Sequence, residues 1–456
     1  MKTLLDRDPA SGEALAEIVS AGRDELSQAV ARARAAQPAW EALGAPERAR
    51  RLAEASESFT QRADELGLLI CREMGKPLES ARGEAGAYGR VLGERAREVA
   101  DALAPETLDG GETESMLVRV PHGVVAAVTP WNFPVAMPMS ILVPALVAGN
   151  TVVFKPSEHV PLVGALIAEV LQAVLPDGVL ELVQGGGDVG AALVASDVDM
   201  IGFVGSRETG QAIMRSASDG LKRLVLELGG KDPLVVMADA DLDAAADAAV
   251  THSLRNTGQV CCSLERIYVA ELVAERFEQL VLKRAKDWKH GDPTKKKTRM
   301  GPMVSEGQRA KVDEQVRDAR QRGARVLMGG EIPAGPGNYY PATVLADVPT
   351  DARIALEETF GPVVCLMRFD GSEAEGIRLA NDTPYGLGAN VYTQDRERGL
   401  RMAGAIKAGQ VGINQYLGSA PGLPWVGARQ SGFGYLGGIE GHRQFTVPKS
   451  ISIKKA

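Results

Sequence analysis

Cys261 and Glu227 are the residues of this chain whose types and spacing best fit covalent chemistry. Cys261 lies in Asn-Thr-Gly-Gln-Val-Cys261-Cys, a short polar stretch between apolar segments, and Glu227 lies 34 positions earlier in Leu-Glu227-Leu-Gly-Gly-Lys. A thiol in a glycine-containing turn can be a nucleophile, and a carboxylate that leads into a Gly-Gly bend can be its base. An amide, Asn132, lies in Pro-Trp-Asn132-Phe-Pro. Together these residues indicate acyl chemistry through a thioester.

The composition is that of an ordinary globular protein and excludes several other classes. The chain has 456 residues, enough for about three domain-sized units. A net charge of −8 disfavours nucleic acid as a partner. No apolar run approaches the roughly 18 residues of a membrane span, and the first residues turn acidic too soon for a signal peptide. We therefore expect a cytoplasmic protein.

The cysteine and histidine patterns predict no metal site. The four cysteines form no Cys-x-x-Cys pair, and the five histidines are scattered, so zinc ribbons and disulfide frameworks are not expected. A small buried thiol is the common state of an isolated cysteine. We expect that state for Cys71, Cys262 and Cys365.

The remaining sequence predicts the elements that position these residues. Helices are expected over 23–43 and 47–74, followed by two series in which strands and helices alternate. The expected strands are Gly123–Val128, Thr151–Phe154, Val179–Val183, Met200–Val204, Leu234–Met237, Ile267–Val269, Arg325–Met328 and Val363–Phe369. The expected helices are Ile141–Ala148, Leu162–Leu175, Glu208–Ser216, Leu242–Leu254 and Leu272–Trp288. Such alternation is typical of an α/β protein with doubly wound parallel sheets.

Two short strands, Leu117–Val120 and Ser450–Ile453, fit neither series. Their flanks are polar, and exposed strand edges of this kind are usually covered by a partner subunit.

Six motifs, in this order, resemble those of the NAD(P)-dependent aldehyde dehydrogenase superfamily. They are Pro-Trp-Asn-Phe-Pro, Phe-Lys-Pro-Ser-Glu, Phe-Val-Gly-Ser, Glu-Leu-Gly-Gly, the Cys261 motif and Glu-Glu-Thr-Phe-Gly-Pro, and the resemblance covers nearly the whole chain. The resemblance implies a Rossmann-like NAD(P)-binding domain over 1–103 and 123–227. An α/β catalytic domain over 228–430 and a small β oligomerisation arm over 104–122 and 444–456 would complete the fold. The arm predicts a homodimer or homotetramer.

The same resemblance assigns the catalytic roles. Cys261 matches the nucleophile, Glu227 the general base of thioester hydrolysis, and Asn132 the amide that stabilises the oxyanion. The implied activity is oxidation of an aldehyde to a carboxylic acid. A non-catalytic NAD-binding protein is the alternative from another class, although such a protein would not need all three residues.

The resemblance also implies a set of cofactor contacts. Lys155 and Glu158 match residues that hold the adenosine ribose, with Ser157 between them; a carboxylate at Glu158 favours NAD, with NADP possible. The other predicted contacts are Gly205 and Ser206 for the pyrophosphate, Trp131 and Leu228 for the nicotinamide pocket, Glu358 for the nicotinamide ribose and Phe360 beside it.

The substrate is less well defined. Arg255 resembles an arginine that succinate-semialdehyde dehydrogenases use to bind the distal carboxylate, but the second arginine of those enzymes is Ser140 here. A structural ion pair is the competing interpretation of Arg255. Phe133 and Trp425 match aromatic residues of the substrate tunnel, so aromatic and long apolar aldehydes are also possible substrates.

Three further positions depart from the pattern of many relatives. Ile141 and Leu436 replace a buried Lys–Glu pair of the proton relay, and Val426 replaces a customary glycine. Replacement of both charges is physically coherent, because loss of only one would leave an unpaired buried charge.

Overall fold

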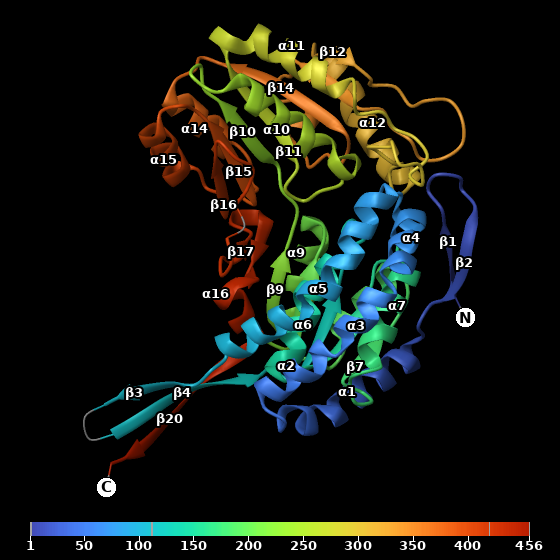
Figure 1. Ribbon diagram of the computed structural model, residues 1–456, viewed down its shortest axis with the longest axis vertical. Helices are drawn as coiled ribbons and strands as arrows, with labels where there is room; N and C mark the ends of the chain where they lie inside the picture. Colours follow the sequence, from blue (N-terminus) through green and yellow to red (C-terminus); the bar gives the residue numbers. More distant parts are fainter. Residues whose placement is uncertain (1, 111–112, 419, 456) are drawn as a thin grey trace.

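The structure is a computed structural model that describes residues 2–110, 113–418 and 420–455. These residues form two large sheets with helices on both faces, and a smaller sheet that projects from the body (Figure 1). Within the described residues no helix has the length and apolarity needed to cross a membrane.

The first large sheet carries Glu227 and the segment that leads to Asn132. Its strand order is β18-β9-β8-β5-β6-β7, and all neighbours are parallel except β18, which runs antiparallel to β9. The strands are β5 (Val124–Val128), β6 (Thr151–Lys155), β7 (Leu180–Leu182), β8 (Met200–Val204), β9 (Arg223–Glu227) and β18 (Gly432–Phe433). β6 and β8 are buried throughout, as expected for parallel strands covered by helices on both faces.

The second large sheet carries the segment that follows Cys261. Its order is β12-β13-β14-β11-β10-β15-β16, parallel except for β12. The strands are β10 (Asp232–Val236), β11 (Leu264–Ala270), β12 (Arg325–Met328), β13 (Thr343–Ala346), β14 (Val363–Phe369), β15 (Gly388–Tyr392) and β16 (Gln410–Ile413). The predicted strands therefore fall in two sheets, whereas β9, β13, β15 and β16 were not predicted.

The helices confirm most of the predicted series. They are α1 (Arg23–Glu41), α5 (Leu78–Ala102), α6 (Ala136–Ala148), α7 (Pro161–Gln172), α8 (Gly187–Ala195), α9 (Arg207–Ala217), α10 (Leu242–Leu254), α11 (Ala274–Ala285), α12 (Glu306–Gln321), α13 (Arg353–Leu356), α14 (Glu373–Asn381), α15 (Arg396–Ala405) and α16 (Gly438–Arg443), with short 3₁₀ turns at η1 (Arg255–Gly258), η2 (Glu271–Val273) and η3 (Arg429–Ser431).

The single helix predicted over 47–74 is wrong. It is three helices, α2 (Ala45–Ala53), α3 (Ala55–Gln61) and α4 (Ala63–Met74), which all pack against the long helix α5. Each short helix buries apolar residues of its own. The chain changes direction at Glu54 and Arg62, so that the apolar face of each helix can pack against α5. α5 itself was not predicted, because four glycines interrupt its apolar pattern.

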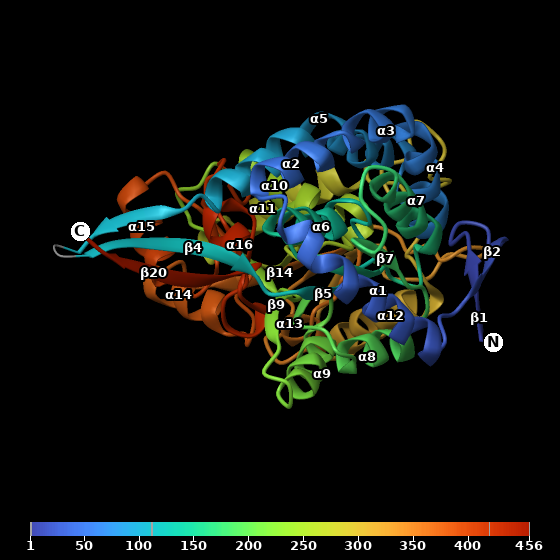
Figure 2. The same ribbon diagram turned by 90° about the horizontal axis from the view of Figure 1, so that it is seen from below.

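The projecting sheet confirms the two isolated strands as parts of longer ones. β4 (Thr113–Pro121) pairs antiparallel with β20 (Thr446–Lys454) on one side and with β3 (Glu106–Asp109) on the other. Figures 1 and 2 both show this sheet extending away from the body, with the C-terminus near its tip. An antiparallel hairpin of β1 (Thr3–Arg7) and β2 (Ala14–Val19), and a two-residue pairing of β17 (Trp425–Val426) with β19 (Tyr435–Leu436), complete the chain.

Candidate active site

The two large sheets contribute the three predicted catalytic residues to one place. Asn132 follows the carboxyl end of β5, and Glu227 ends β9 in the same sheet. Cys261 lies between η1 and β11 of the other sheet. The Asn132 side-chain Nδ2 donates to the backbone oxygen of Gln259, 3.1 Å away and two residues before the thiol. The amide is thereby bound to the loop that carries Cys261.

The loop before Cys261 has an unusual backbone. Asn256 and Thr257 have φ values of 53° and 58°, and Gly258 follows with φ 71°. A left-handed conformation costs roughly 1–2 kcal/mol for each non-glycine residue, and such strain gathers at functional sites. A Cβ on Gly258 would lie 2.0 Å from the backbone oxygen of Gly361, so only glycine fits there. This contact brings the Glu-Glu-Thr-Phe-Gly-Pro motif against the Cys261 loop.

The Cys261 thiol is a weak acid in this environment. The neighbouring Cys262 thiol, burial and the Glu227 carboxyl together raise its pKa well above the ordinary value. Ionisation therefore requires a nearby proton acceptor. Cys262 is buried, as predicted, and its Sγ accepts a hydrogen bond of 3.0 Å from the Tyr416 hydroxyl. Cys71 and Cys365 are also buried free thiols, as predicted.

Glu227 is a buried carboxyl with one oxygen free. Its Oε1 accepts a hydrogen bond of 3.0 Å from the Trp425 indole Nε1, whereas its buried Oε2 has no partner within the described residues. Burial raises the pKa of Glu227 to about 8, and the Trp425 hydrogen bond partly offsets that rise. The Cys261 thiol lowers the pKa of this carboxyl, but by less than burial raises it. A carboxyl with a pKa near neutral, beside a thiol, can act as a general base.

A group of polar side chains lies at the end of β6, formed by Lys155, Ser157 and Glu158. The buried Lys155 Nζ lies 3.7 Å from Glu158 Oε2 and donates to the Pro156 oxygen over 2.8 Å. The Ser157 hydroxyl lies 3.5 Å from the same carboxylate. The Glu158 side chain is 40% exposed, so its oxygens can accept hydroxyl groups of a ligand. The residues present fit the ribose of a dinucleotide.

The start of α9 lies beside the end of β9. Ser206 is the N-cap of this helix, and its Oγ accepts a hydrogen bond from the Thr209 N–H. The Gly205 N–H donates to the Glu227 backbone oxygen over 3.0 Å, which ties the helix start to the predicted base. The N-terminus of a helix of this length can bind a phosphate group.

The structure shows the contacts of the predicted nicotinamide residues. Trp131 and Phe360 pack edge to face with ring centroids 5.4 Å apart. The Glu358 Oε1 accepts a hydrogen bond of 3.0 Å from the Gly230 N–H, and burial raises the pKa of Glu358 to about 7. Leu228 is 5% exposed and packs in the core, so its side chain has little surface for a ligand.

Arg255 contacts the side chain of Tyr416. Its Nη2 donates to the Tyr416 hydroxyl over 3.1 Å, and the guanidinium lies 4.9 Å from the Tyr416 ring centroid. Within the described residues no carboxylate lies at ion-pair distance from Arg255, and its contacts are to Tyr416. Phe133 and Trp425 pack in one small cluster with Cys261.

The packing explains two of the positions at which the chain departs from the pattern of its relatives. Ile141 and Leu436 are both buried in the same apolar cluster, where a lone charge would have no partner.

A buried ion pair that sequence reasoning missed fixes the position of Phe360. Lys231 Nζ lies 2.6 Å from Glu265 Oε2, and the Glu265 carboxylate accepts the backbone N–H groups of Thr359 and Phe360 over 2.8 and 2.9 Å. Lys231 extends the Glu-Leu-Gly-Gly motif and Glu265 lies four residues after Cys261, but nothing in the sequence indicates that the two charges pair.

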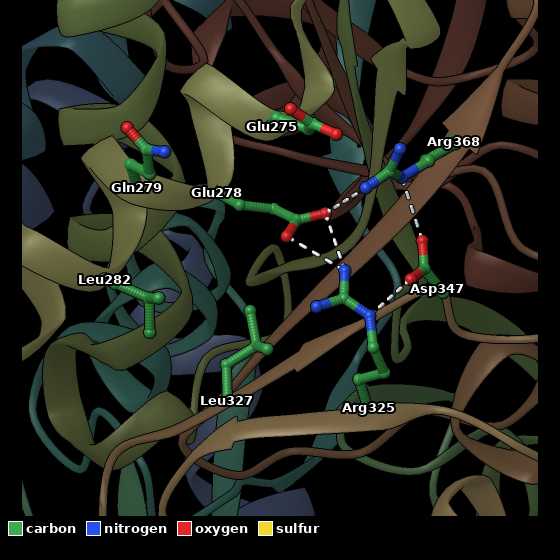
Figure 3. Close-up of a pocket in the computed structure, with 8 residues that line it drawn as sticks. All are labelled: Glu275, Glu278, Gln279, Leu282, Arg325, Leu327, Asp347 and Arg368. Carbon is green, nitrogen blue, oxygen red and sulfur yellow. Dashed lines mark hydrogen bonds and ion pairs between the residues drawn. The ribbon is translucent and has the colours of Figure 1, made fainter.

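The hollow shown in Figure 3 is not part of this site. Its volume is about 590 Å³, and its residues lie on α11, on β12, directly after β13 and at the carboxyl end of β14, whereas Cys261 precedes the amino end of β11. Its arginines are already neutralised: Glu278 pairs with Arg325 and Arg368 over 2.9 and 2.8 Å, and Asp347 pairs with Arg325 over 2.6 Å. The remaining residues of its wall are Glu275, Gln279, Leu282 and Leu327.

Comparison with known proteins agrees with this geometry. Residues 2–451 match the model of the aldehyde dehydrogenase family. A probable succinate-semialdehyde dehydrogenase [NADP(+)] of Sinorhizobium fredii is 39% identical over 98% of this chain and 92% of its own. A glutarate-semialdehyde dehydrogenase of Pseudomonas putida is 38% identical over 99% and 94%. The crystal structure of PnpE in complex with nicotinamide adenine dinucleotide superposes with a TM-score of 0.95 and is 35% identical, over 99% of this chain and 94% of that one.

These matches cover nearly the whole length of this chain and of its relatives. They confirm the α/β fold and the family that the six motifs indicate. The chain belongs to the aldehyde dehydrogenase family of NAD(P)-dependent oxidoreductases.

Proposed function

We propose that Cys261 carries the substrate first as a thiohemiacetal and then as a thioester, and that water releases the carboxylic acid. The observation that carries this proposal is the buried Oε2 of Glu227, which has no hydrogen-bond partner within the described residues and lies near Cys261, in the loop that the Asn132 amide binds. A carboxyl with this pKa can accept a proton both from the thiol and from a water molecule.

The first half of the reaction uses the thiol and the amide. Glu227 accepts the thiol proton, and the sulfur adds to the aldehyde carbon, so a C–S bond forms as the carbonyl oxygen gains charge. One N–H of the Asn132 amide is bound to Gln259. The second N–H of the amide and the Cys261 backbone N–H stabilise the oxyanion. Loss of one such donor typically costs about 3 kcal/mol of transition-state stabilisation.

The second half returns the enzyme to its first state. The nicotinamide of a bound NAD(P) supplies the hydride acceptor. Loss of hydride from the tetrahedral carbon leaves a thioester on Cys261. Glu227 releases the thiol proton to solvent and then takes a proton from water, so that the hydroxide adds to the thioester carbon. The C–S bond breaks to release the acid, and the proton on Glu227 returns to the sulfur. Oxidation of one aldehyde thus reduces one NAD(P).

An assay of NADH formation tests this function directly. Hexanal, benzaldehyde and succinate semialdehyde sample chain length, aromaticity and charge. Turnover of at least one aldehyde is expected. If none reacts while NAD still binds, the non-catalytic alternative is correct.

Replacement of Glu158 by alanine is expected to shift the cofactor preference towards NADP. The carboxylate of Glu158 accepts ribose hydroxyls but repels a 2′-phosphate, so its removal should raise the NADP-to-NAD ratio of kcat/KM by about tenfold. The ratio is measured with one saturating aldehyde. Glu169→Ala, a surface change on α7, is the control. An unchanged ratio in Glu158→Ala would reject this role.

Among substrate classes, an unpaired Arg255 favours an aldehyde with a distal carboxylate. The charge of Arg255 has no acidic partner within the described residues, and the relatives from Sinorhizobium fredii and Pseudomonas putida are named for semialdehydes of this kind. Uncharged aldehydes fit the aromatic residues Phe133 and Trp425. We therefore propose a semialdehyde as the second candidate, within the same reaction.

Replacement of Arg255 by methionine separates these candidates. A charge-assisted hydrogen bond contributes roughly 1.5–3 kcal/mol, so kcat/KM for succinate semialdehyde should fall about 10- to 150-fold. The value for hexanal should change less than about threefold, because no charge is recognised there. Arg299→Met, at an exposed position, controls for loss of one positive charge. Equal losses for both aldehydes would show that Arg255 does not bind the carboxylate.

Assembly and location stay predictions. The projecting β sheet supports a homodimer or homotetramer, because its edge strands present unpaired backbone groups. The cytoplasmic location rests on the sequence alone.

A further inference from the structure

A buried ammonium group lies directly behind the Asn132 loop. Lys76 is 3% exposed and occupies the Gly-Lys-Pro turn between α4 and α5. Its Nζ donates to the Asn132 backbone oxygen over 3.0 Å and lies 4.1 Å from the Phe133 ring centroid. Lysine is almost never this buried unless it is paired, because removal of the charge from water costs several kcal/mol. Its partner is the Glu84 carboxylate.

Glu84 extends the contact to the other end of the same loop. One carboxylate oxygen pairs with Lys76, and the other accepts the backbone N–H groups of Val135 and Ala136 over 3.0 and 3.1 Å. These N–H groups begin α6, which starts where the Pro-Trp-Asn-Phe-Pro segment ends. One ion pair therefore holds the segment at Asn132 and again three residues later.

The turn that carries Lys76 is also fixed against the half of the chain that contains Cys261. Gly75 has φ 80°, and a Cβ there would lie 2.5 Å from the Pro302 ring. The Leu78 N–H donates to the Pro293 oxygen over 2.9 Å. The neighbouring Gly301 oxygen accepts the Thr257 hydroxyl over 3.1 Å, four residues before the nucleophile. Lys76 therefore lies between the loop that carries Asn132 and the 293–302 segment, which contacts Thr257 in the loop of Cys261.

We propose that Lys76 and Glu84 are positioning residues that hold the Asn132 amide in register with Cys261. The proposal rests on the reaction proposed above, since an amide donor needs positioning only if an oxyanion forms. Neither residue touches the reacting atoms. Their contribution is the fixed backbone from which the Asn132 side chain extends, and a donor placed in advance costs no reorganisation when charge develops.

The expected effect is large for residues without substrate contact. A displacement of about 1 Å at a catalytic group costs on the order of 10²-fold in rate. Lys76→Met leaves Glu84 buried without its cation and can prevent folding, so the neutral pair Lys76→Met with Glu84→Gln is the main variant. A glutamine at position 84 retains an oxygen acceptor for the start of α6.

A double-mutant cycle with Asn132→Ala tests the proposal. In the native background the neutral pair should lower kcat about 30-fold, with KM and the Kd for NAD changed less than about twofold. In the Asn132→Ala background the same pair should lower kcat less than about threefold, because the group that it positions is gone. An equal loss in both backgrounds, or no loss in either, would overturn the proposal.

A second reaction separates this proposal from the proposed function. Hydrolysis of p-nitrophenyl acetate acylates the thiol and passes through an oxyanion, but needs no hydride transfer. If the chain hydrolyses the ester but oxidises no aldehyde, the proposed dehydrogenase function is wrong. The double-mutant cycle, measured on ester hydrolysis, then still tests the coupling between the ion pair and Asn132. If Cys261 is acylated by neither substrate, no oxyanion exists to be stabilised and the positioning role fails as well.

Discussion

Replacement of Cys261 by serine is expected to abolish aldehyde oxidation, with kcat lowered by about 10³-fold or more. A serine hydroxyl is a far weaker acid than a thiol, so Glu227 cannot generate the nucleophile at neutral pH. The hemiacetal that must give up hydride then does not form. The remaining turnover is measured as NADH formation with the best aldehyde of the panel, at saturating NAD.

The adjacent residue supplies a matched control. Cys262→Ser makes the same atomic change one position away, and a serine hydroxyl can still accept the hydrogen bond that Tyr416 donates to this sulfur. Its kcat should stay within about fivefold of the native value. Titration of both variants with NAD should give native affinity, since neither thiol belongs to the residues proposed to bind the cofactor. If Cys261→Ser is fully active, or if Cys262→Ser is inactive, Cys261 is not the nucleophile.

The sequence predicts the site well where the chemistry lies in a compact motif. Asn132, Glu227 and Cys261 each stand within a few residues of glycine or proline, and the order of the motifs indicated the family. The apolar runs of β6 and β8 likewise predicted buried parallel strands, because burial on both faces removes the alternation of polar residues.

Contacts between distant segments could not be predicted in this way. Lys76 meets Asn132 across 56 positions, and Arg255 meets Tyr416 across 161. Neither pairing produces a periodic pattern in one segment, so no local signal reports it. The missed α5 has a different cause, because one of its glycines, Gly89, lies where α3 approaches the helix closely. A Cβ on Gly89 would lie 2.3 Å from the Thr60 hydroxyl, so close packing replaced the apolar side chains that would have signalled a helix.

Glu227→Gln is expected to separate formation of the thioester from its hydrolysis. One NADH per active site should appear in a burst, after which turnover should fall by about 10²- to 10³-fold. The burst survives because the thiol can still lose its proton slowly to solvent, and the hydride leaves without help from a base. Hydrolysis stalls because an amide cannot take a proton from water. Rapid-mixing measurement of NADH gives the amplitude, and mass spectrometry of the stalled protein should find the acyl group on Cys261.

The pH dependence of the native enzyme gives an independent test of the same carboxyl. Because the pKa of Glu227 is raised to about 8, most of the carboxyl is protonated at pH 7 and only the ionised minority can act as a base. The hydrolytic rate should therefore rise about tenfold per pH unit below this value and level off above it. Trp425→Phe removes the hydrogen bond that lowers this pKa, so the inflection should move to higher pH. Glu227→Gln should show no inflection in this range, and a Gln variant that turns over steadily with the native pH profile would place the base elsewhere.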